Sequence, residues 1–308
     1  MDYCDFCEKL FRTVERKLSR RDGSHGSMNV RRVSIVKVND CMKEGMSVSA
    51  GEHVPAPTVY FDELYPRYVM GDTVDEIAEG IIEFCIEKLD KLPEEFKGID
   101  DFECAGRNII CRLVNTAANR EYLKDSPHRD ILDLSVIFYY VVEEESTGNS
   151  FGIRIDNRMM ERWHTDVDKL YETSVRNTLL LYGEELENME SVLTELSGAC
   201  CSEIYSEDIA EPMPLFVLTN SRKHFGAVNA VIGSSLSRLA DKLEDDLIIL
   251  PSSVHEVLAV PAHAVDFSIQ QLNEWITNIN TDVLEIKDIL SDHAYVYVRK
   301  DRKLEMRA

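Results

Sequence analysis

The stretch that decides the fold is DLIILPSSVHEVLAV, residues 246–260. It places two apolar runs of strand length on either side of a Pro-Ser-Ser turn, a pattern typical of paired antiparallel strands. Two strands followed by a helix are also indicated in residues 30–90, 132–180 and 215–243. Hairpins combined with separate helices predict an α+β fold with a largely antiparallel sheet. We expect this sheet to be built from repeated strand-strand-helix units, with the helices packed on it.

The last of these units has a basic loop at its centre. Residues 215–219 and 227–232 both read as strands, and we expect them to form a hairpin around the loop 220–226, NSRKHFG. Arg222, Lys223, His224 and exposed backbone N–H groups of this loop could hold a phosphate or a carboxylate. Asn220 would add a polar contact, and so would Ser252, because residues 252–255 and this loop both adjoin strands of one unit. A solvated loop tip is the alternative interpretation.

The domain organisation is simple in outline. A chain of 308 residues can form one large domain or two closely packed ones. We expect a single compact body over residues 1–308. An acidic, irregular segment at 183–212 is the best candidate for a boundary, and it would join two lobes, residues 1–182 and 213–308.

The chain is strongly acidic, since 34 Lys and Arg stand against 56 Asp and Glu, for a formal net charge of −22. Binding nucleic acid or anionic lipid requires Lys and Arg to neutralise phosphates, so we expect neither partner. Residues 1–40 and 294–308 are each net positive, which concentrates the negative charge in the middle of the chain. A protein that acts on another protein by mimicking a polyanion is therefore a third function class.

The sequence also indicates a cellular compartment. The longest apolar runs, such as residues 136–142, are far shorter than the roughly 20 residues that a membrane-spanning helix needs. Charged residues interrupt residues 1–18, so the apolar core of an export signal is missing. Eight scattered cysteines then indicate free thiols in a reducing compartment. We expect a cytoplasmic protein.

Several motifs resemble those of a known family. They are Leu218-Thr219-Asn220, Phe225-Gly226-Ala227, the run from Leu250 to Val257, Leu290-Ser291-Asp292, and Tyr295, Tyr297 and Arg299. With weaker matches over most of the chain, the sequence is similar to an uncharacterised domain-of-unknown-function family of anaerobic clostridial bacteria. It is more distantly similar to the YtpQ-like group, whose activity is also unknown. The resemblance implies a bacterial cytosolic protein and supplies no catalytic residue.

Residues 252–256, SSVHE, hold two hydroxyls, an imidazole and a carboxylate close together. On a strand, Ser253 and His255 would face one way and Glu256 the other, because side chains alternate. A serine–histidine relay would then need a different acid, and Asp292 or Asp133 could serve. The alternative is a turn in which the serine hydroxyls cap backbone groups and the histidine is packed and hydrogen-bonded.

We expect neither a metal nor a cofactor. His255 lacks the second histidine four residues along that a helical zinc site needs, since Ala259 stands there. Cys4 and Cys7 have the spacing of a redox pair or half a zinc site, but no second such pair follows. The sequence also lacks a glycine-rich nucleotide-binding signature.

Two main function classes remain. The first is a non-enzymatic cytosolic binding or regulatory protein, whose partner would be a protein or a small anionic ligand. The absence of a complete catalytic constellation favours it. The second is a hydrolase or transferase that uses Ser253 and His255 on an anionic substrate held by Arg222 or Lys223. A Ser253 hydroxyl within hydrogen-bond reach of the His255 or His293 ring, in an open cleft, would favour the enzyme.

Overall fold

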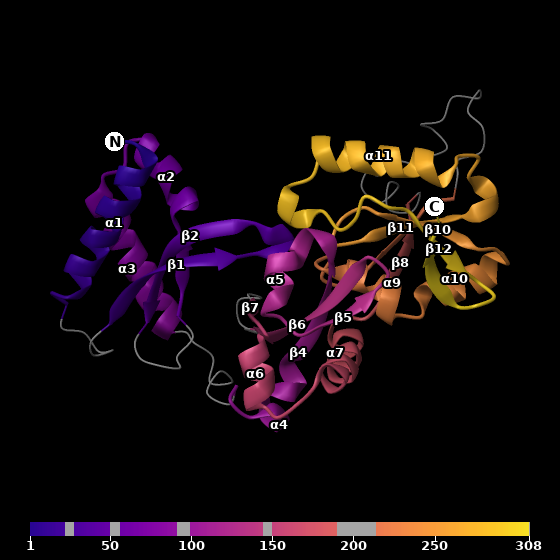
Figure 1. Ribbon diagram of the computed structural model, residues 1–308, viewed down its shortest axis with the longest axis horizontal. Helices are drawn as coiled ribbons and strands as arrows, with labels where there is room; N and C mark the ends of the chain where they lie inside the picture. Colours follow the sequence, from indigo (N-terminus) through magenta and orange to yellow (C-terminus); the bar gives the residue numbers. More distant parts are fainter. Residues whose placement is uncertain (22–27, 50–55, 91–98, 144–149, 190–213, 308) are drawn as a thin grey trace, which may run out of the picture. The chain divides into compact units, whose positions relative to one another are not determined.

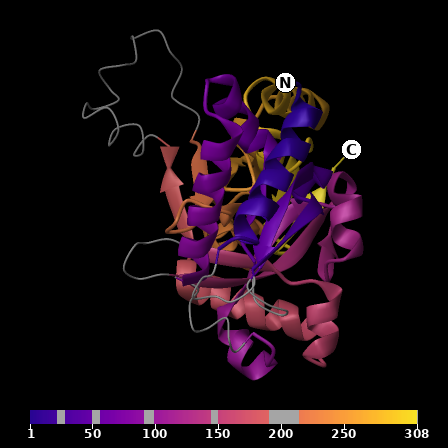
Figure 2. The same cartoon turned by 90° about the vertical axis from the view of Figure 1, so that its left-hand side faces the viewer.

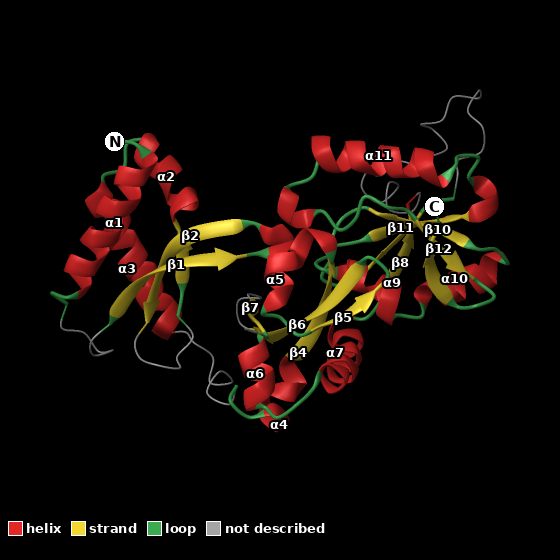
Figure 3. Cartoon of the chain, in the orientation of Figure 1, coloured by secondary structure: helices red, strands yellow, loops and turns green. Residues whose placement is uncertain are grey.

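The chain is represented by a computed structural model that describes residues 1–21, 28–49, 56–90, 99–143, 150–189 and 214–307 (Figure 1). The chain divides into two compact units, Met1–Lys37 with Cys41–Ile99, and Val38–Asp40 with Asp100–Ala308. Both contain helices and antiparallel strands, which confirms the predicted α+β class (Figure 3). The single compact body stays a prediction, and most of the acidic segment 183–212 lies outside the described residues. No helix among the described residues is both long and apolar enough to span a bilayer.

The first unit packs helices against a three-stranded antiparallel sheet with strand order β1-β2-β3. Its elements are α1 (Tyr3–Leu18), β1 (Asn29–Val36), β2 (Met42–Ser49), β3 (Thr58–Tyr60), α2 (Phe61–Val69) and α3 (Val74–Asp90). Helices α1 and α3 stand side by side (Figure 2). Phe6, Leu10 and Val14 recur at every fourth position of α1 and are fully buried in the core that it shares with α3 and the sheet. Their spacing is the reason why α1 buries one face.

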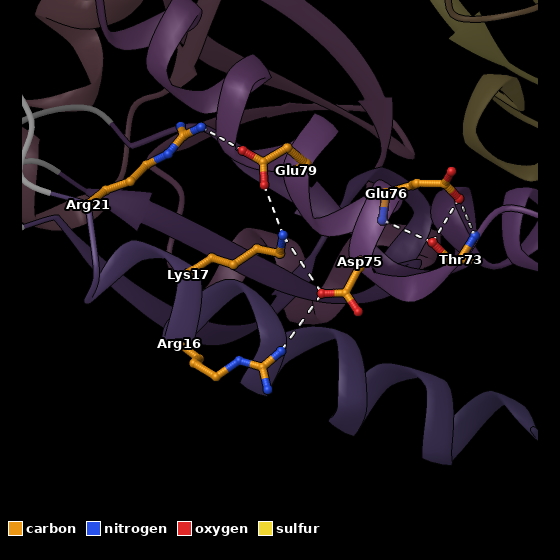
Figure 4. A network of polar contacts seen from close by, with 7 residues as sticks. All are labelled: Arg16, Lys17, Arg21, Thr73, Asp75, Glu76 and Glu79. Atoms are coloured by element: carbon orange, nitrogen blue, oxygen red, sulfur yellow. Dashed lines mark hydrogen bonds and ion pairs between the residues drawn. The ribbon is translucent and has the colours of Figure 1, made fainter.

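Charged residues line the exposed side of the contact between α1 and α3 (Figure 4). Lys17 Nζ lies 2.9 Å from Glu79 Oε2 and 3.7 Å from Asp75 Oδ1. At the start of α3, the Thr73 N–H donates to Glu76, and the Glu76 N–H donates to the Thr73 hydroxyl. This reciprocal cap fixes where α3 begins. Exposed ion pairs contribute little to stability, so the buried apolar stripe holds the two helices together.

The second unit begins with a small antiparallel sheet around β6. Strand β6 pairs with β4 along one edge, and with β5 and then β7 along the other. The elements are α4 (Phe102–Ala105), η3 (Gly106–Asn108), β4 (Ile109–Asn115), η4 (Ala117–Asn119), α5 (Arg120–Lys124), β5 (His128–Ile131), β6 (Leu134–Glu143), β7 (Ser150–Arg154), α6 (Asn157–Arg162) and α7 (Val167–Tyr182). Helix α7 packs on β4, where the Thr178 hydroxyl accepts a hydrogen bond from the Cys111 N–H.

A six-stranded sheet with order β13-β12-β10-β11-β9-β8 completes the second unit, and every neighbouring pair is antiparallel. Its strands are β8 (Glu185–Asn188), β9 (Phe216–Thr219), β10 (Leu247–Pro251), β11 (Val257–Pro261), β12 (Tyr295–Val298) and β13 (Lys303–Met306). The associated helices are α10 (Ser235–Leu243), η7 (Ala262–Ala264), α11 (Ile269–Asp282) and η8 (Ile286–Asp288). Residues 246–260 supply the central hairpin, as predicted. Helix α11 covers this sheet through Leu272 and Ile276, which pack with Ile248 and Val296 (Figure 3).

Residues 227–232 are helical, and their prediction as a strand is wrong. They form η6 (Gly226–Val228) and α9 (Asn229–Ile232). Strand β9 already pairs with β8 on one edge and β11 on the other, so it has no edge left for a hairpin partner. Instead, the Asn229 side chain turns back and donates hydrogen bonds to the carbonyl oxygens of Thr219 and Gly183.

Two asparagines bind each other reciprocally in the second unit. The Asn119 Nδ2 donates to Asn39 Oδ1 at 2.7 Å, and the Asn39 N–H donates to Asn119 Oδ1 at 2.6 Å. The Asn119 Nδ2 also donates to the carbonyl of Asn115 at 2.7 Å. Asn39 adopts the left-handed conformation, with φ 59°, which asparagine tolerates better than most residues. The turn Val38–Asp40 is therefore held by side-chain hydrogen bonds rather than by apolar packing.

Replacing Asn119 with alanine is expected to lower the free energy of unfolding by about 2 kcal/mol, because a fully buried side chain loses three hydrogen bonds and leaves partners unsatisfied. Urea denaturation followed by circular dichroism measures this change. Asn278→Ala, at an exposed position on α11, is the control and is expected to change stability by less than about 0.5 kcal/mol. Equal stabilities of the two variants would contradict the structural role of the asparagine pair.

Candidate functional site

A cavity of about 260 Å³ lies in the second unit, between β4 and the loop that follows β9. Strand β6 and helix α7 complete its walls. Ile110 and Val141 give it an apolar part, Arg112 and Arg222 give it a cationic part, and the imidazole of His224 lines it as well. Among the residues that the structure describes, no Asp or Glu lines this cavity. On a chain with a net charge of −22, this is a local concentration of positive charge and hydrogen-bond donors.

Arg112, in the middle of β4, holds its guanidinium between two aromatic rings. Its Cζ lies 4.0 Å from the ring centroid of Tyr139 and 3.8 Å from that of Phe225. The Arg112 Nε is buried and has no hydrogen-bond partner among the described residues. Burial lowers the pKa of this guanidinium, although an arginine stays charged at neutral pH. A buried donor without a partner costs about 1–3 kcal/mol, which a ligand that accepts from Arg112 would offset.

The loop beside Arg112 is organised by Asn220, which is 2% exposed. Its Oδ1 accepts hydrogen bonds from the N–H groups of Arg222 and His224, and its Nδ2 donates to the His224 carbonyl. Every backbone N–H from Ser221 to Phe225 donates to an acceptor within the protein. The expectation of exposed N–H groups in this loop is therefore wrong. An anion in the cavity would meet side chains instead.

His255 holds the loop in place through a hydrogen bond and a ring contact. Its Nδ1 accepts the Phe225 N–H at 3.1 Å, and its Nε2 lies 3.3 Å from Asp288 Oδ1, so the neutral ring carries its hydrogen on Nε2. The His224 ring stacks on the His255 ring, with centroids 4.8 Å apart. Partial burial lowers the pKa of His224, and both His255 and Arg112 add to this effect while Asp288 opposes it. His224 is therefore mostly neutral at pH 7.

Ser253 and His255 are neighbours, but no hydrogen bond joins their side chains. The Ser253 hydroxyl accepts the backbone N–H of His255 at 3.0 Å, which is the arrangement of a serine-capped turn. Asp292 is exposed and accepts a hydrogen bond from Asn280, whereas the acid beside the His255 ring is Asp288. Catalysis by Ser253, His255 and Asp292 stays a prediction.

The four residues predicted to bind a ligand are divided between the cavity and its surroundings. Asn220 and Arg222 line the cavity. Lys223 does not line it; its Nζ lies 4.0 Å from Glu187 and its side chain is 65% exposed. The Ser252 hydroxyl lies 3.5 Å from a Glu256 carboxylate oxygen. Arg112 was missed, although a single charged residue within the apolar run 109–114, IICRLV, was a visible signal.

The chemistry of the cavity is suited to binding. Cys111 lines it, and burial raises the pKa of this thiol to about 11, so it is not a thiolate nucleophile at neutral pH. Among the described residues, no group of three His, Cys, Asp or Glu side chains is placed to hold a metal ion. The donors that remain are guanidinium, imidazole and hydroxyl groups, and these are groups that bind anions.

Comparison with known proteins places the chain in a family. Searches of the curated proteins and of the solved structures find no match to this sequence. The model of a family of unknown function, DUF5688, matches residues 3–299, which include every residue that lines the cavity. This chain therefore belongs to DUF5688, a family of unknown function.

Proposed function

We propose that this protein is a non-enzymatic binding or regulatory protein whose second unit holds a small organic anion in the cavity beside β4. Arg112 carries this proposal, because its guanidinium forms no ion pair with a described carboxylate and its Nε has no described partner. A buried guanidinium that no described carboxylate neutralises is costly to keep, even beside the Tyr139 hydroxyl. A guanidinium whose two faces are covered by rings still presents its N–H edges, which match the oxygens of a carboxylate or phosphate.

The size and charge of the cavity restrict what it can admit. A volume of about 260 Å³ lies just below the usual range for ligand pockets and suits a small molecule. The acidic chain as a whole disfavours polyanions such as nucleic acid, while Arg112 and Arg222 make this one cavity favourable for a compact anion. Ile110 and Val141 would contact the apolar part of such a ligand.

The bacterial cytoplasm is the proposed setting, as the resemblance to clostridial proteins and to the YtpQ-like group implies. The same proposal includes the regulation of another protein through ligand binding. A hydrolase or transferase reaction through Ser253 and His255 is the alternative. Binding is better supported, because both nitrogens of the His255 ring already face partners other than the Ser253 hydroxyl.

Two neighbouring residues of the loop provide a matched test. Inorganic phosphate, phenyl phosphate, benzoate and succinate are titrated into the whole protein by isothermal calorimetry. At least one is expected to bind, and Arg222→Ala is expected to weaken its binding about tenfold, since a charged hydrogen bond contributes about 1.5–3 kcal/mol. Lys223→Ala removes the same charge from the same loop, outside the cavity, and is expected to change affinity less than about twofold. Failure of all four anions to bind, or equal losses in the two variants, would refute the proposal.

A further inference from the structure

We propose that a solvent-exposed side of helix α11 is a docking surface for a basic amphipathic helix of another protein. The surface consists of Phe267, Trp275, Ile279 and Val283, and is called the α11 stripe below. None of these residues lines the cavity beside β4. Docking of a partner here and anion binding in the cavity are therefore separate properties, and either can fail without the other.

The α11 stripe is apolar and open to solvent, with exposed fractions from 46% at Trp275 to 73% at Val283. Trp275, Ile279 and Val283 recur at every fourth position, so they form a row along the helix. The Phe267 ring extends this row, because its centroid lies 4.5 Å from that of Trp275. A neighbouring side of α11 already packs on the sheet (Figure 1). The apolar surface of α11 thus extends beyond the part that the sheet covers, and a contiguous exposed patch of this kind marks an interaction site.

The surroundings of the α11 stripe are acidic. Residues 243–286 contain no Lys or Arg, whereas Asp266, Glu274 and Asp282 belong to α11 or its approach. All three carboxylates are exposed, and none forms an ion pair with a described residue. Asp282 follows Ile279 by three residues, and positions three apart are neighbours on a helix surface. An apolar row beside unpaired carboxylates is complementary to an apolar row flanked by Lys and Arg.

The same carboxylates disfavour other occupants. A second copy of this chain, docked stripe to stripe, would bring two sets of carboxylates together. An anionic membrane surface would be repelled in the same way. The segment 190–213 of this chain is acidic and contains no Lys or Arg, so it is equally unsuited. A helix is the matching shape, because rows of side chains along two helices interdigitate.

Trp275 reports on the surface to which it belongs. The chain has two tryptophans, and Trp163 is only 7% exposed. The whole protein is titrated with an amphipathic helical peptide built from leucine and lysine. We expect affinity in the micromolar range, with the tryptophan emission moving to shorter wavelength as Trp275 loses contact with water. Two further peptides, one with glutamate in place of lysine and one scrambled so that it has no apolar side, are expected to bind at least about tenfold more weakly.

Variants distinguish the α11 stripe from the rest of the acidic chain. Ile279→Ser is expected to weaken binding of the leucine–lysine peptide about tenfold, because an apolar contact is lost. Val69→Ser removes a similarly exposed apolar side chain from the end of α2, in the first unit, and is expected to change the affinity less than about twofold. Asp282→Asn is expected to weaken binding about threefold, and added salt should reduce this difference. Trp275→Phe should remove the emission shift while calorimetry still detects binding.

Four results would overturn the docking surface, and none of them bears on anion binding. The leucine–lysine peptide could fail to bind. Ile279→Ser could bind it as tightly as Val69→Ser does, or the scrambled peptide could bind as tightly as the amphipathic one; the attraction would then be that of an acidic chain in general. The emission could shift with phosphatidylcholine vesicles and not with the peptide, which would make the α11 stripe a membrane contact. Finally, the protein could sediment as a dimer that Ile279→Ser dissociates, and the occupant would then be a second copy.

Discussion

Replacing Arg112 with methionine is expected to abolish anion binding and, at the same time, to raise the free energy of unfolding by about 1–2 kcal/mol. The variant removes a largely buried charge that has no carboxylate partner among the described residues. Methionine is unbranched and makes favourable contacts with aromatic rings, so it can fill the space between Tyr139 and Phe225. Binding of phenyl phosphate should fall at least a hundredfold, since a bidentate charged contact is lost.

Urea denaturation and calorimetry on the same preparations measure the two effects. Arg129→Met is the matched control, because Arg129 also lies over a ring, with its Cζ 4.4 Å from the Tyr171 centroid. Arg129 differs in being 47% exposed and in lying 3.5 Å from Asp168, so its replacement should change neither stability nor binding by much. If Arg112→Met instead destabilises the protein by about 2 kcal/mol, the two rings hold Arg112 for structural reasons, and the case for a ligand loses its basis.

The parts of this fold that local sequence determines were predictable. The hairpin of β10 and β11 follows from two apolar runs around Pro251, because turn chemistry and strand propensity act within a few residues. The basic loop was recognised as a candidate ligand site for the same reason, and the structure places Asn220 and Arg222 on the cavity wall.

Long-range contacts account for what the sequence did not reveal. Residues 227–232 form a helix because both edges of β9 are occupied by distant strands, which no local pattern indicates. Arg112 reaches the cavity from β4, more than a hundred residues before the loop that it contacts. Asp288, not Asp292, lies beside His255, and only the folded chain distinguishes these two carboxylates. The site is therefore a product of tertiary structure, although its loop could be found in the sequence.

Gly226→Ala is expected to be the most destabilising of the substitutions considered, with a loss of about 3 kcal/mol in the free energy of unfolding. A Cβ at this position would lie 2.5 Å from Thr219 Oγ1, 2.7 Å from the Asn220 nitrogen and 2.8 Å from the His255 carbonyl oxygen. Two of these atoms belong to the backbone and cannot rotate away. The end of β9 would have to move from His255, breaking the 2.9 Å hydrogen bond from the Thr219 hydroxyl to the His255 carbonyl.

The same displacement should also abolish anion binding, because Asn220 and His255 together position the loop that carries Arg222, His224 and Phe225. Gly106→Ala is the control: Gly106 is buried in the same unit, but a Cβ there meets its nearest neighbour at an ordinary 4.0 Å. Its helical backbone accepts alanine, so that variant should be as stable as the unmodified protein or slightly more so. Urea denaturation and phenyl phosphate titration of both variants then show whether the close approach of neighbouring atoms, rather than burial alone, makes a glycine necessary. If Gly226→Ala kept full stability and affinity, the tight approach of β9 to His255 would not be what shapes the cavity.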